Sequence, residues 1–246
     1  MQRAQVRVLS AVALAALTLA GTAACSVLDQ KTLEDDAKVS QRITSIRLDS
    51  RDGGVEVDAS ADTTAVSVHR RVSYHGDKPD GTSFHVEDGV LVLSGCGGKC
   101  GVDYVVKAPA GLAVTGGTSN GGLALSGVGK VDVHTSNGEI RVTDAAGPVR
   151  LRTSNGGVHV EGARGGGVDA QTSNGEVTIR TATPQNVKAR TSSGSLTVTV
   201  PPAAYRVSAD NTNGDKKVSV KDDPSGRYRL DLSTTNGDLT VRPAKG

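Results

Sequence analysis

Hydrophobic and polar residues alternate along most of the chain after residue 113, and a short polar motif interrupts this alternation at near-regular intervals. The motif Thr-Ser-Asn-Gly occurs four times unchanged, and three degenerate copies follow it. Its glycines are Gly121, Gly138, Gly156, Gly175, Gly194, Gly214 and Gly237, at intervals of 17 to 23 residues. Alternation with a period of two predicts β-strands, and a near-fixed longer period predicts a solenoid or another repeat array.

Alignment on these glycines shows apolar columns seven and five positions before the glycine, and two and four positions after it. Around Gly156 the columns hold Val149, Leu151, Val158 and Val160, and only Lys216 departs from the column two positions after the glycine. Each repeat therefore predicts a strand, a corner and a second strand. Stacking successive repeats ~4.8 Å apart buries both strands in one narrow core. We expect an all-β, single-domain β-solenoid with two strands per rung of 17–23 residues.

Polar columns give the stacking further support. Six positions before the glycine stand Asp132, Arg150, Asp169 and Lys188, whose charges alternate in sign. In-register stacking makes these residues neighbours, and opposite charges there contribute roughly 0.2–1 kcal/mol per pair. The corner asparagines predict a structural ladder of amide hydrogen bonds through Asn120, Asn137, Asn155, Asn174, Asn213 and Asn236.

The corner threonines, such as Thr135 and Thr153, share parity with the buried valines, so we expect them to turn inward. The alternative is an outward threonine ladder like that of ice-binding solenoids.

Before residue 114 the repeat becomes irregular. The residues Ile46, Leu48, Gly53, Val55 and Val57 match the offsets of a degenerate first rung. Strands are expected over 66–72, 84–92 and 104–106, without a fixed period. We therefore divide the chain after residue 42 into an irregular β cap with a degenerate first rung (43–113) and regular solenoid repeats (114–246). The turn-forming segment 222–226 lengthens the last interval and is expected to project as a loop.

The N-terminus has the organisation of an export signal. Arg3 and Arg7 precede the apolar run 8–20, and small residues lead from there to Cys25, which predicts a secretory signal peptide over residues 1–24. Residues 19–25 resemble the lipobox of bacterial lipoproteins, with Thr22 where Leu or Val is usual. The resemblance implies lipidation of Cys25 and a lipid anchor on the extracytoplasmic face of the cell membrane. Plain secretion with a free Cys25 thiol is the alternative.

Residues 25–42 are polar and free of Gly-Pro turn chemistry. We interpret them as a lipid-anchored tether with a short helix around 32–39.

Composition indicates the shape of the core and limits the class of partner. Aromatic residues make up 2% of the chain and tryptophan is absent, as a thin core between two sheets requires. Lys and Arg number 28 against 26 Asp and Glu, and Arg3 and Arg7 account for the difference. Removal of the signal peptide leaves a formally neutral chain, so a nucleic-acid partner is not supported.

Cys96 and Cys100 flank a Gly-rich loop. In an exported chain this arrangement predicts a local disulfide. A metal site shared with His75 or His85 is the alternative, but two thiolates without a second cysteine pair are a weak zinc signal.

No protease, hydrolase, P-loop or dinucleotide motif occurs. The corner carboxylates Glu139, Glu176, Asp215 and Asp238 raise the question of calcium, but they supply one oxygen donor group per corner in four of seven rungs, whereas repeat-type calcium sites use several. His134 and His159 lie on outward positions of different strands. We therefore expect no catalytic, cofactor-binding or metal-binding residue.

Several motifs together resemble a known family. The signal and lipobox, the segment 43–48, the Val-x-x-Pro-Ala-Gly-like segment 106–111 and the stacked Ser-Asn-Gly corners are similar to the bacterial putative-adhesin family of exported repeat β-solenoid lipoproteins. The resemblance covers about residues 43–242. It implies the solenoid fold and carries no catalytic signature, because the biochemical role of that family is uncharacterised.

The sequence thus supports two hypotheses. The first is a non-enzymatic, lipid-anchored cell-envelope protein whose stiff solenoid serves adhesion or scaffolding, with an unknown envelope or extracellular partner, protein or glycan. The second is an exported polysaccharide hydrolase or lyase on a β-helix scaffold, with catalytic groups hidden in residues 60–110.

Overall fold

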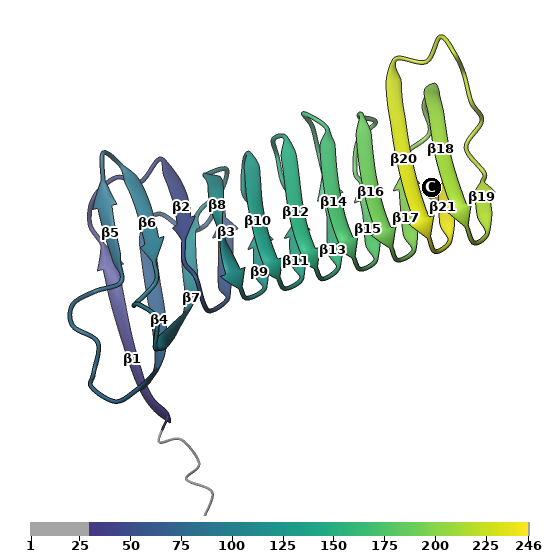
Figure 1. Ribbon diagram of the computed structural model, residues 1–246. Helices are drawn as coiled ribbons and strands as arrows, with labels where there is room; N and C mark the ends of the chain where they lie inside the picture. The colour runs from purple at the N-terminus through teal and green to yellow at the C-terminus, as the bar shows by residue number, and fades with distance from the viewer. Residues whose placement is uncertain (1–29, 246) are drawn as a thin grey trace, which may run out of the picture.

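The computed structural model describes residues 30–245. The expected signal peptide and Cys25 lie outside this range. The described residues form 21 β-strands in two sheets, which stack into an elongated two-layered solenoid (Figure 1). Within the same range, no helix has the length and apolar character that crossing a bilayer requires.

The first sheet has eleven strands in the order β1-β4-β7-β3-β9-β11-β13-β15-β17-β21-β19. In sequence order their bounds are β1 (Gln30–Val39), β3 (Val55–Ser60), β4 (Val66–His75), β7 (Cys100–Pro109), β9 (Leu123–Ser126), β11 (Ile140–Thr143), β13 (Val158–Ala163), β15 (Val177–Thr181), β17 (Leu196–Val200), β19 (Lys216–Val218) and β21 (Leu239–Pro243).

The second sheet has ten strands in the order β18-β20-β16-β14-β12-β10-β8-β2-β6-β5. Their bounds are β2 (Ser45–Asp49), β5 (Phe84–Glu87), β6 (Val90–Ser94), β8 (Ala113–Asn120), β10 (Val131–Asn137), β12 (Val149–Asn155), β14 (Val168–Asn174), β16 (Val187–Ser193), β18 (Tyr205–Asn213) and β20 (Tyr228–Asn236).

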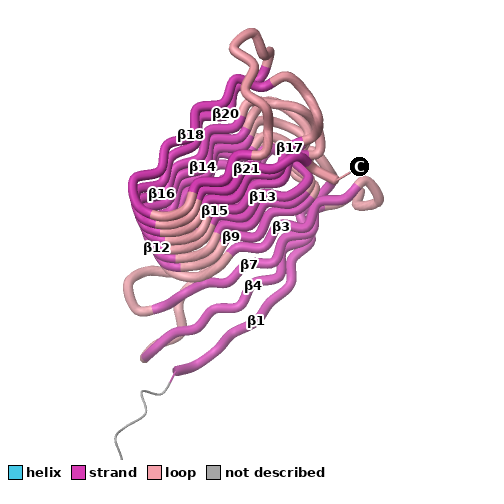
Figure 2. Tube along the Cα trace, turned by 90° about the vertical axis from the view of Figure 1, so that its right-hand side faces the viewer, coloured by secondary structure: helices cyan, strands magenta, loops and turns pink. Residues whose placement is uncertain are grey.

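Each regular rung contributes one strand to each sheet, joined at the Thr-Ser-Asn-Gly corner. The ladders are parallel and in register, so Val131 pairs with Val149 and Val149 with Val168 in the second sheet. Viewed toward one end, the two sheets face each other with the corners stacked along one edge (Figure 2). The predicted all-β solenoid with two strands per rung is confirmed.

Small apolar side chains fill the narrow space between the sheets. Buried Val, Leu, Ile and Ala from both sheets form one cluster along the described solenoid, and Tyr104 and Tyr205 are its largest members. The corner threonines also point inward: Thr153 is 6% exposed, and its hydroxyl donates to the carbonyl oxygen of Gly138 at 3.1 Å. An outward threonine ladder of the ice-binding type is therefore not formed.

The corner glycines are required by close approach of the backbones. Gly156 has φ of +155°, and a Cβ at this position would lie 2.0 Å from the carbonyl oxygen of Gly138 in the neighbouring rung. That separation is a steric overlap with backbone, which no side-chain rotation relieves. Only glycine allows the rungs to stack at this spacing.

The cap adds a rung that the sequence pattern did not reveal. The expected first rung, β2 and β3, pairs in parallel with β8 and β9. A second rung, made by β6 and β7, stacks on its other side. The single strand expected over 84–92 is wrong, because Asp88 and Gly89 adopt positive φ and turn the chain into the antiparallel β5–β6 hairpin.

The helix expected around residues 32–39 is also wrong. Residues 30–39, placed in the polar tether by the sequence, form the strand β1, which pairs antiparallel with β4 at the end of the first sheet. Cross-strand ion pairs hold it there, including Glu34 with Arg71 at 2.7 Å. Leu33 packs against the core from the same strand. Partner charges on β4 therefore override the local sequence, which carries no strong β signal.

Successive repeats do not stack in sequence order at the C-terminal end. The last rung in the chain, β20 and β21, lies between β16–β17 and the earlier rung β18–β19, as Figure 1 shows. Leu230 and Leu239 are fully buried in this inner position. The outer rung has the exposed Lys216 and a Val218 that is 39% exposed. The more polar rung thus covers the end, and the expectation of strictly sequential stacking is wrong there.

Candidate binding face

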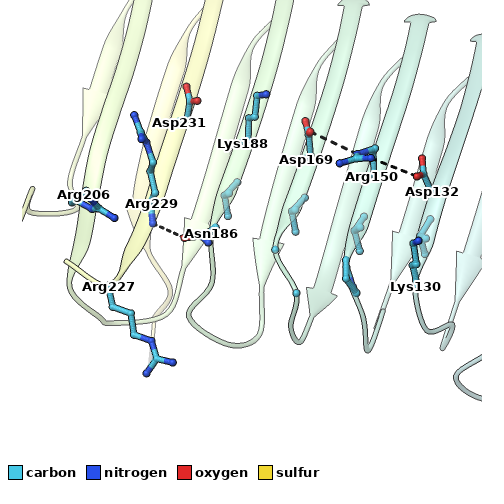
Figure 3. A pocket seen from close by; sticks show the side chains of 17 residues that line it. Lys130, Asp132, Arg150, Asp169, Asn186, Lys188, Arg206, Arg227, Arg229 and Asp231 are labelled. Atoms are coloured by element: carbon cyan, nitrogen blue, oxygen red, sulfur yellow. Dashed lines mark hydrogen bonds and ion pairs between the residues drawn. The ribbon is translucent and has the colours of Figure 1, made fainter. Parts of the chain in front are cut away.

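The outward side chains of β10, β12, β14, β16, β20 and β18 form one continuous polar surface, which we call the grooved face. Along its centre runs the charged column that the sequence predicts, in the spatial order Asp132, Arg150, Asp169, Lys188 and Asp231. Arg150 lies 3.7 Å from Asp132 and 3.9 Å from Asp169 (Figure 3). Asp231 continues the alternation and also contacts Arg190 at 3.2 Å. Positive and negative charges alternate in this column, so each Asp lies beside a cation of a neighbouring rung.

The neighbouring column has no such alternation, because it contains cations and no acidic residue. Eight positions before each corner glycine stand, in spatial order, Lys130, Pro148, Gly167, Asn186, Arg229 and Arg206. The middle members are small or neutral, and cations occupy both ends. Together with the charged column, these residues line a groove of about 740 Å³ across the face.

Two arginines are direct neighbours at one end of this groove. Arg206 pairs with Arg229 in the parallel ladder between β18 and β20, and both are exposed. Within residues 30–245, neither guanidinium contacts a carboxylate within ion-pair distance. The nearby Asp222 instead accepts a hydrogen bond from the backbone N–H of Val207 at 2.8 Å. Like charges side by side in a ladder destabilise the sheet, so this pair breaks the rule that the charged column follows.

A second groove, of about 570 Å³, lies on the same face nearer the corners. Alternate columns of hydroxyl groups and longer polar side chains line it. The hydroxyl column comprises Ser136, Ser154, Ser173, Ser192 and Thr235, and the other column includes His134, Arg152, Gln171 and Arg190. The grooved face is therefore rich in hydrogen-bonding groups over its whole width.

The corner asparagines border this face as two short ladders. Nδ2 of Asn155 donates to Oδ1 of Asn137 at 2.9 Å, and Nδ2 of Asn174 donates to Oδ1 of Asn155 at 3.0 Å. The same contact joins Asn137 to Asn120, whose amide then donates to Asp52 at 2.7 Å. Asn213 donates to Asn236 in a separate pair. Ser193 lies between the two ladders and interrupts them.

The cysteine pair lies at the opposite end of the molecule from the arginine pair. Cys96 and Cys100 form a disulfide at the corner between β6 and β7, where other rungs have Thr-Ser-Asn-Gly. The thiolate metal site considered for this pair is therefore not formed. Across residues 30–245, no cluster of three or more His, Cys, Asp or Glu side chains is placed to hold a metal ion.

The corner carboxylates considered for calcium make contacts within the protein. Glu139 pairs with Arg141, and Glu176 accepts a hydrogen bond from the Thr178 hydroxyl at 2.6 Å. Asp238 accepts from the backbone N–H of Asp215 at 3.0 Å. His159 lies 3.8 Å from Glu139 on the face of the first sheet, away from His134. These residues stabilise their own corners and do not converge on one centre.

The irregular cap contains one buried polar cluster. Arg70, 4% exposed, is paired with Asp35 of β1, and its Nη1 donates to the Ser83 hydroxyl at 3.1 Å. The Tyr104 hydroxyl lies 2.7 Å from the carbonyl oxygen of Ser94. Burial raises the pKa of Tyr104 to about 12. The ion pair and hydrogen bonds of this cluster connect β1 and the 76–83 loop to the rest of the cap.

Sequence reasoning identified the charged column but missed the arginine pair. The signal was present, since Lys130, Arg206 and Arg229 all stand eight positions before a corner glycine. That position belongs to the strand in some rungs and to the preceding turn in others, so it does not form an obvious column in the sequence.

The fold and the surface define a class: a parallel two-sheet β-solenoid with a thin aliphatic core and a grooved polar face. Residues 40–242 match the family model Toastrack DUF4097, and the chain belongs to this family. The resemblance drawn from the sequence is confirmed at the level of family and fold. No curated protein matches the chain.

Solved structures of similar proteins share low identity with this chain. A putative adhesin from Bacteroides fragilis is 14% identical, with a TM-score of 0.46, and the match covers 87% of this chain and 97% of that one. A putative cell adhesion protein from Clostridium sporogenes is 12% identical, with a TM-score of 0.40 and coverage of 87% and 100%. A putative adhesin from Parabacteroides distasonis is 15% identical, with a TM-score of 0.39 and coverage of 88% and 98%.

Proposed function

We propose that this protein is an exported, lipid-anchored component of the cell envelope, and that it uses the grooved face to bind a partner in adhesion or scaffolding without catalysis. The observation that carries the proposal is the in-register alignment of polar side chains from six rungs into one face with two grooves. A repeating array of this kind suits an extended ligand.

Stiffness of the scaffold supports a binding role. Parallel ladders join every rung to its neighbours in both sheets, and the corners add a second set of side-chain hydrogen bonds. A ligand that binds such a surface loses little affinity to the ordering of loops, because the backbone is already ordered. The grooved face is built mainly on strands, and its edge column lies partly in the short turns that precede them.

Anchoring at the N-terminus would place the grooved face away from the membrane. β1 begins at Gln30, five residues after Cys25, and lies at one end of the solenoid. The arginine pair lies at the other end. A diacylglyceryl group on Cys25 supplies the two acyl chains that stable anchoring takes, and the solenoid would then extend from the bilayer.

The carboxylates of the grooved face argue against a glycoside hydrolase site on that face. A general acid for glycoside cleavage is a carboxyl whose pKa is raised by an apolar environment, opposite a second carboxylate. Asp132 and Asp169 instead flank the same Arg150, and Asp231 contacts Arg190. These groups are arranged as counter-ions of a stacking ladder.

Membrane anchoring is tested by fractionation. Substituting Cys25→Ala should release the full-length protein from the membrane fraction into the soluble extracytoplasmic fraction, whereas Cys96→Ala/Cys100→Ala should leave it in the membrane. Unchanged fractionation of the Cys25 variant would refute lipidation.

Binding and catalysis are separated by a glycan array followed by product analysis. The proposal expects retention of one class of glycan or envelope polymer, with the chain length of the recovered polymer unchanged after prolonged incubation. Shortened products would establish the enzymatic alternative.

A further inference from the structure

We propose that the groove of the grooved face binds a linear acidic polysaccharide whose carboxylates are spaced by neutral sugars, and that Arg206 and Arg229 form its principal anion site. This inference rests on the proposed binding function and specifies its ligand class. It is carried by three features of the groove: uncompensated charge, length and the absence of aromatic rings from its lining.

The charge of the groove is uncompensated only at its ends. Along the centre, each Asp of the charged column faces a cation of the neighbouring rung. The pair Arg206 and Arg229 at one end, and Lys130 at the other, make no ion pair within residues 30–245. Figure 3 shows Arg206 and Arg229 side by side on neighbouring strands at the groove. Arg206 and Arg229 are paired in the ladder, so two cations without an ion-pair partner stand on neighbouring strands at this end, and a carboxylate there would compensate their charge.

The length of the groove suits a polymer. Lys130 and Arg229 stand four rungs apart in the second sheet, which corresponds to about 19 Å at ~4.8 Å per rung. Pro148, Gly167 and Asn186 line the groove between them, and none of these residues carries a charge or a long side chain. A single small anion occupies one end at most, whereas an extended chain can reach both cationic ends at once.

The chemistry of the lining favours an acidic sugar polymer over other polyanions. Single-stranded nucleic acids bind on aromatic rings that stack with their bases, and no Phe, Tyr or Trp lines either groove. Hydroxyl, amide and guanidinium groups are the partners that sugar hydroxyls and carboxylates need, and the adjoining groove provides columns of them.

Acidic residues inside the groove limit the charge density of the ligand. Asp132, Asp169 and Asp231 lie beside the path between the cationic ends. A polymer with a charge on every unit would meet these carboxylates along its length. A polymer in which neutral sugars alternate with carboxylated ones places fewer like charges against them, so we expect it to bind more tightly than a dense polyanion.

Defined hyaluronan fragments are the probe, because their carboxylates stand on alternate sugars. Binding to the full-length protein, purified from membranes in detergent, is measured by calorimetry at low and at physiological salt. We expect binding that weakens with salt and that falls at least about tenfold in the variant Arg206→Gln/Arg229→Gln, since each lost charge-assisted bond is worth a factor of this order.

A matched variant controls for the change in net charge. Lys107→Gln/Arg180→Gln removes two exposed cations from the outer face of the first sheet, and it should leave hyaluronan affinity within twofold of the wild type. The variant Arg206→Gln/Arg229→Gln should melt no lower than the wild type, because it relieves repulsion within the ladder. Loss of binding with an unchanged melting temperature would therefore reflect loss of the site.

Neutral dextran and linear polyphosphate complete the design. Absence of hyaluronan binding, equal binding by the arginine variant, or binding of polyphosphate alone would each overturn the inference. Cys25-dependent anchoring and retention of another partner on the array would survive any of these results, so failure of the ligand assignment is distinguishable from failure of the proposed function.

Discussion

Gly156 shows how a single residue sets the spacing of the whole stack. Its missing side chain lets the carbonyl oxygen of Gly138 approach to where a Cβ would stand, and the same geometry recurs at successive corners. The identity of the corner residue is therefore decided by the neighbouring rung as much as by its own φ. This explains why the glycine persists where the preceding asparagine is replaced, as at Ser193-Gly194.

The first prediction concerns this corner. Gly156→Ala should lower the free energy of unfolding by about 2 kcal/mol or more, because it combines a strained φ with overlap against backbone. Gly165→Ala is the control, since a Cβ there would lie no closer than 3.9 Å to Ala146. Urea unfolding of both variants measures the difference, and equal losses of stability would contradict the steric account.

The second prediction concerns the buried tyrosines. Burial raises the pKa of Tyr104 to about 12, and that of Tyr205 to about 12 with a contribution from Tyr228. In the unfolded chain these tyrosines have their ordinary pKa of about 10. The unfolded state is therefore stabilised relative to the folded state as pH rises above 10. Thermal stability should therefore be retained below pH 10 and fall between pH 10 and 12.

Differences between variants isolate this effect from other titrations at high pH. Tyr104→Phe should melt below the wild type at pH 8, because it loses the contacts to Ser83 and Ser94. Its melting temperature should then fall less steeply than that of the wild type up to pH 11.5. Tyr74→Phe serves as the control for loss of a phenol, and parallel pH profiles for Tyr104→Phe and the wild type would count against the prediction.

At the scale of elements, the asparagine ladders follow the spatial order of the rungs and are interrupted at one of them. The ladder from Asp52 to Asn174 stops at Ser193, and the pair Asn236 and Asn213 follows on its other side. The break is chemical, because a serine side chain is too short to span two rungs. Thr234 nonetheless donates to Gly194 at 3.0 Å across the same break, so the backbone register is continuous.

The third prediction repairs this break. Ser193→Asn should connect the two ladders, because residue 193 is in register with both Asn174 and Asn236. Two new hydrogen bonds at an exposed corner should raise the free energy of unfolding by about 1 kcal/mol. The control is Ser193→Ala, which should have little effect. No gain in chemical denaturation for the asparagine variant would show that the amides bond to water instead.

Individual elements also show where sequence reasoning succeeds. The columns of valines, the alternating charges and the inward threonines were predictable because each depends only on a residue's offset from the corner glycine. The order of rungs at the ends was not, since Leu230 and Val207 occupy the same column and either fits beside Val187. Lys216 and the exposed Val218 are the only local signs that β18 and β19 form the outer rung.

The cap and the site were predictable only in part, for related reasons. The 84–94 hairpin depends on Asp88 at positive φ, which no hydrophobic pattern reveals. Strand β1 depends on charges of β4 some 35 residues away. The arginine pair needed the alignment to be extended beyond the strand into the turn. Long-range partners, and not local propensity, decide all three features.

At the scale of the whole molecule, the alternating charges of the column make the effect of removing rungs depend on whether their number is odd or even. Each rung reverses the sign, so Asp132 meets Arg150, then Asp169, then Lys188 along the stack. Because rungs interact mainly with their neighbours, whole rungs can be removed at their glycine corners. Removing an odd number of rungs places like charges side by side, whereas removing an even number places opposite charges side by side.

The fourth prediction tests this parity. Deleting residues 139–156 removes one rung and places Asp132 beside Asp169, whereas deleting 139–175 removes two and places Asp132 beside Lys188. Both proteins should fold, but the one-rung deletion should gain melting temperature as salt rises from low to physiological concentration, since salt screens the new repulsion. The two-rung deletion should show no such gain. The same salt response in both would mean that the column contributes nothing measurable.

The inner placement of β20 and β21 also governs how the molecule is completed during synthesis. The ribosome produces β18 and β19 before the strands that belong beneath them, so their final seat does not exist until residues 228–243 have emerged. A chain that ends early therefore lacks an internal layer and not its outermost one. The last strands to be synthesised therefore occupy an inner position of the stack. The outer rung, β18 and β19, can reach its final place only after they have folded.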